Sequence, residues 1–180
     1  MLKREISPGI DIKELELRHV NEFYAFIEKG RINFENWIPF VSTTTSLELA
    51  EKKIEIYLGM VMTGKGYFWC LWKDNKIIGL ILIKDIDEKA RTAEIGYMVD
   101  KEFEGKGLIR ESCKLMIEFI FSELKMNKIV LCCDENNIKS IGIAKRFNFE
   151  LEGILKQNIS INGKNRNTMC WALFWDNGLK

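Results

Sequence analysis

The chain has 180 residues, of which 47% are hydrophobic, enough for one buried core, so we expect a single domain over residues 1–180. Its 27 basic and 26 acidic residues leave a formal net charge of +1, which argues against nucleic acid or an anionic membrane as the main partner. Charged residues interrupt the N-terminal stretch where a signal peptide needs its apolar core. We therefore expect a cytoplasmic protein.

Cysteine and histidine usage limits the kinds of site that the chain can build. The cysteines show no C-x-x-C spacing and mostly sit inside apolar runs, so buried reduced thiols are expected; they are Cys70, Cys113, Cys132, Cys133 and Cys170. The one histidine, His19, follows a predicted strand and is expected at the surface. A metal site built on several histidines is therefore not expected.

The first third of the chain predicts one strand and two helices. Ile10–Leu17 alternates apolar and charged residues, which is typical of a strand. Val20–Ile27 has apolar residues at helical spacing and predicts a short amphipathic helix. Ser46 is a good N-cap for a second helix over Leu47–Met62, which glycines terminate.

The middle of the chain predicts a hairpin, a third strand and a central helix. Tyr67–Trp72 and Lys76–Ile83 are strand-like and flank Asp74-Asn75, a dipeptide suited to a tight turn. Ala93–Val99 is the next predicted strand. Leu108–Leu124 is apolar on two faces, so this helix is expected to pack against a sheet.

The last third predicts a strand over Lys128–Cys133, a helix over Asn137–Phe147, and two long strands, Phe149–Ile161 and Arg166–Trp175. The two long strands flank Asn162-Gly163, a strong hairpin signal. The order of the elements predicts an α/β fold with a mixed, mostly antiparallel twisted sheet of about seven strands flanked by about four helices.

A glycine-containing loop precedes the predicted central helix. It reads Glu104-Gly105-Lys106-Gly107 and leads directly into Leu108. The first turn of a helix has N–H groups without internal partners and a positive dipole end, so this entry predicts an anion site, with a phosphate of a bound cofactor as the ligand. The alternative for the loop alone is a turn that merely caps a core helix.

Two other phosphate motifs fail on spacing. A dinucleotide fingerprint needs a third glycine where Arg110 stands. A nucleoside-triphosphate loop would begin at Gly59, but Gly66 occupies its Ser or Thr position and a predicted helix, not a strand, precedes it.

The glycine loop instead resembles the acyl-CoA pyrophosphate loop of the GNAT superfamily of N-acetyltransferases, whose pattern is Gln/Arg-x-x-Gly-x-Gly/Ala. Glu104 and Ile109 depart from that pattern. Asn137-x-x-Ser140 and Asn148-Phe149 resemble the second half of the family motif, an Asn in a strand-to-helix turn and a Gly-Phe after the helix. Asn can replace this Gly because it tolerates the left-handed conformation.

The RimJ/RimL-type branch, which acetylates N-termini of ribosomal proteins, is the part of the superfamily that the chain resembles most. Similar segments are Glu94-Ile95-Gly96-Tyr97, the FEGKG loop, Asn137-x-x-Ser140 and Trp37-Ile38-Pro39. The resemblance implies a single-domain GNAT fold with splayed central strands and acetyl-CoA as cofactor. It also implies direct acetyl transfer to a primary amine in a ternary complex.

The resemblance assigns roles to individual residues. Glu94, in an otherwise apolar strand, is the expected general base, directly or through water; the alternative is a structural hydrogen-bond acceptor. The family's usual tyrosine acid is replaced by Ala144, so Ser140 is the expected acid or thiolate donor, or else a local helix-start residue. The expected cofactor-binding residues are Tyr97, Met98, Val99, Glu104, Gly105, Lys106, Gly107, Leu108, Ile109, Arg110, Asn137 and Ser140.

Phe34, Trp37, Ile38 and Phe40 lie where the family shapes its acceptor pocket, and the alternative is that they pack the core.

A lysine-like amine with a pKa of about 10.4 needs roughly 4.6 kcal/mol to deprotonate at pH 7, whereas an α-amine at about 7.8 needs only about 1 kcal/mol. One carboxylate therefore suits a peptide N-terminus better. The alternatives are a small-molecule acetyltransferase acting on a polyamine, amino acid or aminoglycoside, and a noncatalytic acyl-CoA-binding module. Exposed sheet edges would suit a homodimer.

Overall fold

The computed structural model describes residues 4–175, so the predicted domain also includes residues 1–3 and 176–180, which lie outside this range. Eight strands and five α-helices form within the described residues. The strands are β1 Arg4–Ser7, β2 Ile10–Glu14, β3 Tyr67–Lys73, β4 Lys76–Asp87, β5 Thr92–Val99, β6 Lys128–Asp134, β7 Glu150–Ile161 and β8 Lys164–Phe174. The helices are α1 Val20–Phe34, α2 Pro39–Thr43, α3 Leu47–Met62, α4 Leu108–Ser122 and α5 Ile138–Arg146.

The strands form one mixed sheet in the order β1-β2-β3-β4-β5-β6-β8-β7, in which β5 and β6 pair in parallel and the other neighbours are antiparallel. This confirms the predicted α/β fold. The prediction missed β1, which pairs with β2 at one edge, and the short helix α2, which begins at Pro39. A four-residue strand and a five-residue helix are too short for periodicity to reveal.

Helix α1 continues past its predicted end at Ile27 to Phe34. It passes through Gly30, where an added Cβ would collide with the ring of Phe34. The glycine therefore makes room for an aromatic ring, and the helix does not end there. The predicted first strand, Ile10–Leu17, is shorter in the structure: β2 ends at Glu14 and a 3₁₀ turn follows over Leu17–His19.

The predicted turns have the expected backbone conformations. Asp74 and Asn75 have φ values of 48° and 57°, and Asn162 has a φ of 52° before Gly163, so both hairpins turn through left-handed residues. Asn148 also has a positive φ of 57°, as predicted for the residue that replaces the family's glycine. The hairpins therefore set the register of the sheet locally, by turn chemistry.

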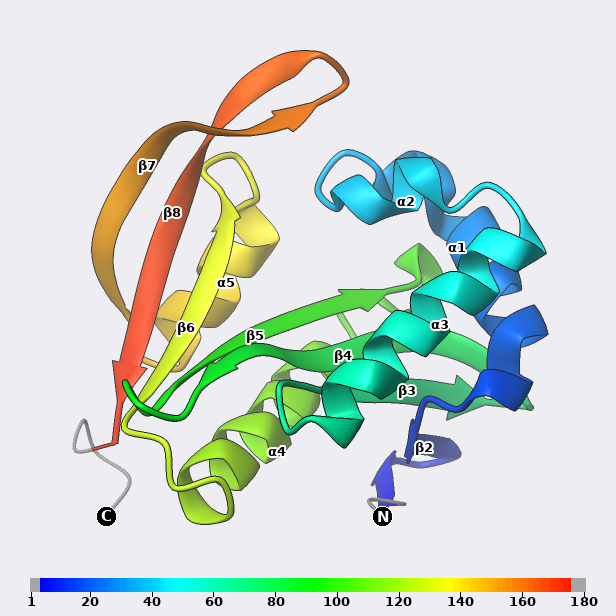
Figure 1. Ribbon diagram of the computed structural model, residues 1–180, viewed down its shortest axis with the longest axis horizontal. Coiled ribbons are helices and arrows are strands. Elements are labelled where there is room, and N and C mark those ends of the chain that lie inside the picture. Colours follow the sequence, from blue (N-terminus) through cyan, green and yellow to red (C-terminus); the bar gives the residue numbers. More distant parts are fainter. Residues whose placement is uncertain (1–3, 176–180) are drawn as a thin grey trace.

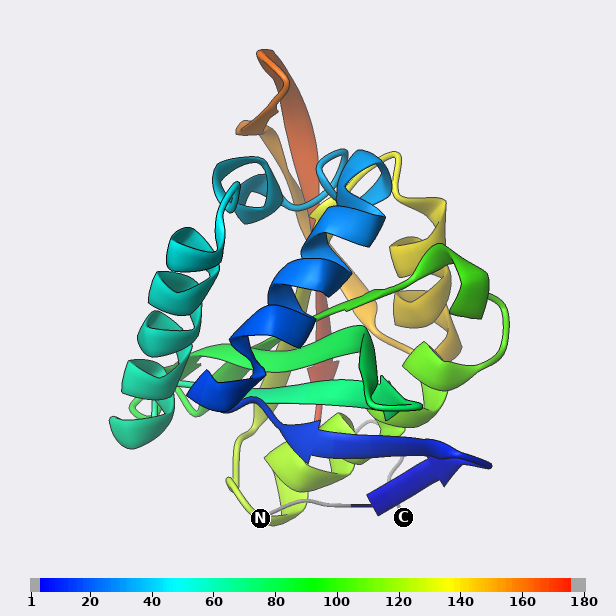
Figure 2. The same ribbon diagram turned by 90° about the vertical axis from the view of Figure 1, so that its right-hand side faces the viewer.

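Helices cover both faces of the sheet. On one face α4 and α5 pack over a core that includes Ile95, Ile120 and Leu131. On the other face α1 and α3 lie side by side over a second core that includes Phe23, Ile54 and Leu80 (Figure 2). The sheet thus separates the two cores, and ligands bound on its opposite faces can meet only where neighbouring strands part.

Strands β5 and β6 part in the middle of the sheet. They pair from Thr92–Ile95 to Lys128–Leu131 and then diverge, so that β6, β8 and β7 form an arm directed away from β5 (Figure 1). This confirms the predicted splay of the central strands. Successive N–H groups of a strand point to opposite edges, so alternate backbone groups of residues 96–99 face the gap.

Candidate active site

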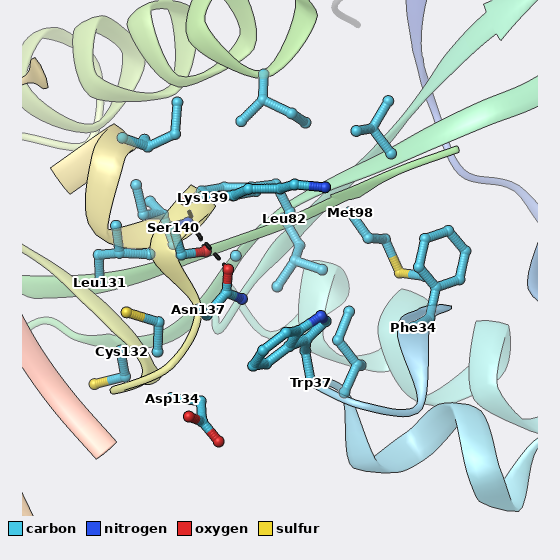
Figure 3. Close-up of a pocket in the computed structure, with 18 of the residues that line it drawn as sticks. Phe34, Trp37, Leu82, Met98, Leu131, Cys132, Asp134, Asn137, Lys139 and Ser140 are labelled. Atoms are coloured by element: carbon cyan, nitrogen blue, oxygen red, sulfur yellow. Dashed lines mark hydrogen bonds between the residues drawn. The ribbon is translucent and has the colours of Figure 1, made fainter. Parts of the chain in front are cut away.

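A cleft of about 1550 Å³ opens where β5 and β6 part. It is larger than the 300–1,000 Å³ typical of one small ligand, which suits two ligands that meet. Figure 3 shows its two walls: Phe34, Trp37 and Met98 on one side, and on the other Cys132 of β6, Asn137 at the start of α5 and Ser140 of α5. We call the part at the β5–α4 loop and α5 the cofactor side, and the part under α1, α2 and α3 the acceptor side.

The glycine loop leaves open space in front of α4. Gly105 and Gly107 have φ values of 72° and 79°, which favour glycine. A Cβ at Gly105 would meet nothing within 4 Å, and at Gly107 only Arg110 Nη2 at 3.8 Å. The glycines are thus required by the backbone conformation, not by packing. The unpartnered N–H groups at the start of α4 face this open space, which fits a phosphate.

All but one of the predicted cofactor residues line the same cleft. The ones that line it are Tyr97, Met98, Val99, Glu104, Gly105, Gly107, Leu108, Ile109, Arg110, Asn137 and Ser140. Lys106 differs from this group, because it does not line the cleft. Its ammonium lies 4.7 Å from the centroid of the Phe103 ring, which holds the side chain against the preceding 3₁₀ turn. The role of Lys106 as a charge partner of the cofactor therefore stays a prediction.

Glu104 replaces the Gln or Arg of the family pattern, and its carboxylate pairs with Lys139 of α5. The side chain of Glu104 thus turns across to α5 and away from the glycine loop. This pairing neutralises a carboxylate that would otherwise repel a diphosphate. Sequence reasoning missed Lys139, because only the fold brings α5 beside the loop.

Ser140 is held by two neighbours. Asn137 caps α5, and its Oδ1 accepts a hydrogen bond from Ser140 N at 3.1 Å (Figure 3). The Tyr97 hydroxyl donates to Ser140 Oγ at 3.2 Å. Burial raises the pKa of Tyr97, so the phenol stays protonated and remains the donor. The hydrogen of the Ser140 hydroxyl is therefore free to be donated into the cleft.

Glu94 lines the cleft on the acceptor side, with a side chain 19% exposed. It lies directly opposite Lys84 in the β4–β5 register, and Lys84 Nζ is 2.7 Å from Glu94 Oε1. Lys84 leans toward the gap, because its Cε would lie 3.8 Å from a Cβ placed at Gly96. The carboxylate thus has a cationic partner that the strand sequence alone did not indicate.

The predicted acceptor residues have mixed surroundings. Phe34, Trp37, Ile38 and Phe40 all line the cleft. Phe34 is also 6% exposed and packs on Phe26, with ring centroids 5.1 Å apart. Phe34 therefore both packs in the core and lines the cleft.

Arg166 of β8 links the two walls of the cleft. Its Nη1 donates to Asp134 Oδ2 at 3.3 Å and to the carbonyl oxygen of Asn36 at 3.1 Å, and its guanidinium lies 5.8 Å from the Trp37 ring centroid. The Asp134 side chain is only 3% exposed. These residues are far apart in sequence, so no local pattern predicts the contact.

Two sequence expectations about thiols and histidine need correction. Cys132 and Cys170 are half-buried, with sulfur atoms 3.6 Å apart, because their strands leave the main core. Burial, aided by Glu94, raises the pKa of Cys132 to about 12, so its thiol stays protonated at neutral pH. His19 is half-buried, not at the surface, and packs on Trp72 with ring centroids 4.8 Å apart.

No helix within residues 4–175 has both the length and the apolar character needed to cross a bilayer.

Comparisons with known proteins agree with this site. Residues 10–150 match the family model for the acetyltransferase (GNAT) domain. A ribosomal-protein-serine acetyltransferase of Escherichia coli (strain K12) is 27% identical over 161 residues, covering 88% of each chain. A spermidine N(1)-acetyltransferase of the same strain is 33% identical over 101 residues, covering 56% of this chain and 54% of that one.

Among solved structures, the RimL ribosomal L7/L12 alpha-N-protein acetyltransferase in complex with coenzyme A has a TM-score of 0.90 at 21% identity. The match covers 96% of this chain and 97% of that one, and it shows the same fold. The family model covers most of the chain and the fold agrees throughout. The chain therefore belongs to the GNAT acetyltransferase family and is an acetyl-CoA-dependent N-acetyltransferase.

Proposed function

We propose that the acceptor is the α-amine of a protein or peptide N-terminus, and that acetyl-CoA and acceptor are bound together during transfer. The observation that carries this proposal is the parting of β5 and β6. It joins the cofactor side, with the glycine loop and Ser140, to the acceptor side, with Glu94 and Trp37, in one cleft. Two ligands that enter from opposite faces of the sheet would meet at the gap.

Acetyl-CoA supplies a thioester carbonyl that a neutral amine can attack. In the proposed reaction Glu94 accepts the proton of the acceptor amine, directly or through water, once the Lys84 ammonium has turned aside. Of the backbone N–H groups of residues 97 and 98, the one that faces the gap would donate to the carbonyl oxygen as its negative charge grows. As the carbon–sulfur bond breaks, Ser140 would donate its hydroxyl hydrogen to the departing sulfur and regain a proton from solvent water, with Tyr97 fixing its orientation.

The charges of the cleft support an N-terminal acceptor over a polyamine. The carboxylates that line the cleft in the described part of the chain are Glu94, Glu104 and Asp134, and each is paired with a lysine or arginine. A polyamine would bring extra positive charges to a wall that offers them no free carboxylate. A peptide N-terminus carries one amine whose deprotonation costs only about 1 kcal/mol at pH 7.

We also infer a cytoplasmic location, supported by free thiols at all five cysteines. A homodimer is proposed through the edge strand β7, on which Leu151, Ile154 and Leu155 are 43–50% exposed. Sedimentation velocity of the wild type and of Leu155→Asp tests the dimer. A dimer that Leu155→Asp dissociates is expected, and a monomeric wild type would refute it.

Thiol release from acetyl-CoA across a panel of acceptors tests the function. The panel contains peptides beginning with Ser or Ala, the same peptides with a blocked N-terminus, spermidine, free amino acids and an aminoglycoside. We expect release with the free peptides only, and mass spectrometry should place the acetyl group on the α-amine. Release with spermidine alone would contradict the peptide proposal. Acetyl-CoA binding without release for any acceptor would indicate a binding module.

A further inference from the structure

Within the described part of the chain, one cation on the acceptor side has no acidic partner. The cations that line the cleft are Lys53, Lys84, Lys101, Arg110, Lys139 and Arg146. Lys84, Arg110 and Lys139 each form an ion pair with a glutamate. Within residues 4–175 no ion pair is found for the other three. The unpaired charge of the cleft is therefore positive, and it is divided between the two sides.

Two of the unpaired cations belong to the cofactor side. Lys101 lies in the turn before the glycine loop, and Arg146 lies at the end of α5. The phosphates expected at the start of α4 are natural partners for both. Lys53 differs from them, because it lies on α3, which covers the opposite face of the sheet. A phosphate bound at the glycine loop therefore leaves Lys53 without an anion.

The ammonium of Lys53 is fixed by aromatic rings and not by an acid. Its Nζ lies 4.8 Å from the ring centroid of Phe40 and 4.9 Å from that of Tyr57. Tyr57 is itself held by stacking on Phe68, with centroids 4.0 Å apart. Burial lowers the pKa of Lys53, which means that the charged form has lost some of its hydration. A partly dehydrated ammonium that is held against the rings of Phe40 and Tyr57 is suited to bind a carboxylate.

The sheet sets the distance from the gap to Phe68, the residue on which Tyr57 stacks beside Lys53. Phe68 lies opposite Leu82, and Leu82 lies opposite Gly96, at the point where β5 leaves β6. Two strand spacings of about 4.8 Å separate Phe68 from Gly96, or about 10 Å. An extended peptide advances about 3.3 Å per residue, so a chain with its amine at the gap would bring its third or fourth residue under Lys53.

We propose that Lys53 binds an acidic side chain of the acceptor, so that the enzyme prefers N-terminal sequences with Asp or Glu at about the third or fourth position. This inference rests on the proposed function, because it specifies which N-terminal sequences the enzyme would prefer as acceptors. Phe40 and Tyr57 orient the ammonium, and Lys53 is a specificity residue that takes no part in the chemical step.

The test compares matched peptides that begin with Ser and carry one Glu or one Gln at position 2, 3, 4 or 5. For wild type we expect kcat/KM to be about tenfold higher for Glu than for Gln at position 3 or 4, mainly through KM. The advantage should shrink as ionic strength rises. Lys53→Met keeps the packing on the rings and should abolish the advantage, whereas Lys53→Arg keeps the charge and should retain it.

Lys52→Met is the matched control, because Lys52 is exposed and pairs with Glu48 within α3. It should retain the full preference for Glu. Equal kcat/KM for Glu and Gln at every position in the wild type would overturn the inference while the proposed function stands. A preference that survives in folded Lys53→Met would overturn it as well. If no peptide is acetylated while spermidine is, the proposed function itself is wrong and the inference falls with it.

Discussion

The Tyr97 hydroxyl donates a hydrogen bond of 3.2 Å to Ser140 Oγ across the gap between β5 and α5. This contact is the direct side-chain link between the strand that carries Glu94 and the helix that Asn137 caps. It places the serine hydroxyl at a fixed point beside the gap. The position that holds a tyrosine in many superfamily members is Ala144 here, buried in the core. Tyr97 thus supplies a phenol to the site from a different element.

Replacing Ser140 with Ala should lower the single-turnover rate of acetyl transfer about 100-fold, because the departing sulfur loses its hydrogen-bond donor. Tyr97→Phe keeps the ring and removes only the hydroxyl that orients Ser140, so it should lower the rate less than about tenfold. Rapid-mixing thiol detection measures both rates. An unchanged rate in Ser140→Ala would exclude Ser140 as the acid.

Glu94→Gln should reduce kcat at least about 100-fold while the Kd for acetyl-CoA changes less than about twofold, because the carboxylate lies on the acceptor side. Isothermal titration and steady-state kinetics separate the two effects. Glu104→Gln serves as the control for the same chemical change away from the acceptor, since Glu104 lies on the cofactor side and pairs with Lys139. Equal turnover in Glu94→Gln and wild type would leave Glu94 as a structural partner of Lys84.

Arg166→Met should destabilise the fold by about 3 kcal/mol, because it leaves the buried Asp134 carboxylate without its cation. Adding Asp134→Asn should restore part of this loss. Urea denaturation of the two variants and the wild type measures the free energies of unfolding. Stability equal to wild type in Arg166→Met would show that Asp134 is satisfied by Asn136 alone, whose backbone N–H donates to it at 2.8 Å.

Gly107→Ala should destabilise the protein by about 1–2 kcal/mol and weaken acetyl-CoA binding, because alanine disfavours the φ of 79° at the start of α4. Gly59→Ala is the matched change in an exposed helix position where a Cβ meets nothing within 4 Å. It should stabilise the protein by about 0.5–1 kcal/mol. Thermal melts with and without acetyl-CoA measure the change in stability of each variant. A stability change of the same sign in Gly107→Ala and Gly59→Ala would contradict this prediction.

The pKa of His19 lies below its ordinary value of 6.5, mainly because burial against Trp72 disfavours the charged ring. The unfolded chain therefore binds this proton more tightly than the folded protein, and stability falls as pH falls below about 6.5. His19→Asn should remove this component, so the difference in Tm between pH 7.5 and pH 5.5 should be smaller than in wild type. An equal difference in the two proteins would show that carboxylates alone cause the acid sensitivity.

Much of the fold follows from local chemistry. The turns at Asp74-Asn75 and Asn162-Gly163 and the Ser46 cap of α3 were all readable from short segments. What could not be read was pairing over long sequence distances. The strand β1 has too few residues for a pattern, and α1 continues because Phe34 fills the space beside Gly30.

The candidate site likewise combines residues that lie in sequence motifs with partners that only the fold brings near them. Glu94, Ser140 and the glycine loop lie in motifs, so sequence reasoning named them. Their partners are brought by the fold: Lys84 comes from the neighbouring strand, Lys139 from a helix, and the Tyr97 hydroxyl from β5. Sequence thus indicated the groups proposed to react, while the groups that neutralise and orient them depend on tertiary structure.

The parting of β5 and β6 has a kinetic consequence. Because the two substrates would approach the gap from opposite faces in the proposed reaction, each product could leave by its own route without waiting for the other. Coenzyme A should therefore inhibit competitively against acetyl-CoA but noncompetitively against the acceptor. The acetylated peptide should show the reverse pattern.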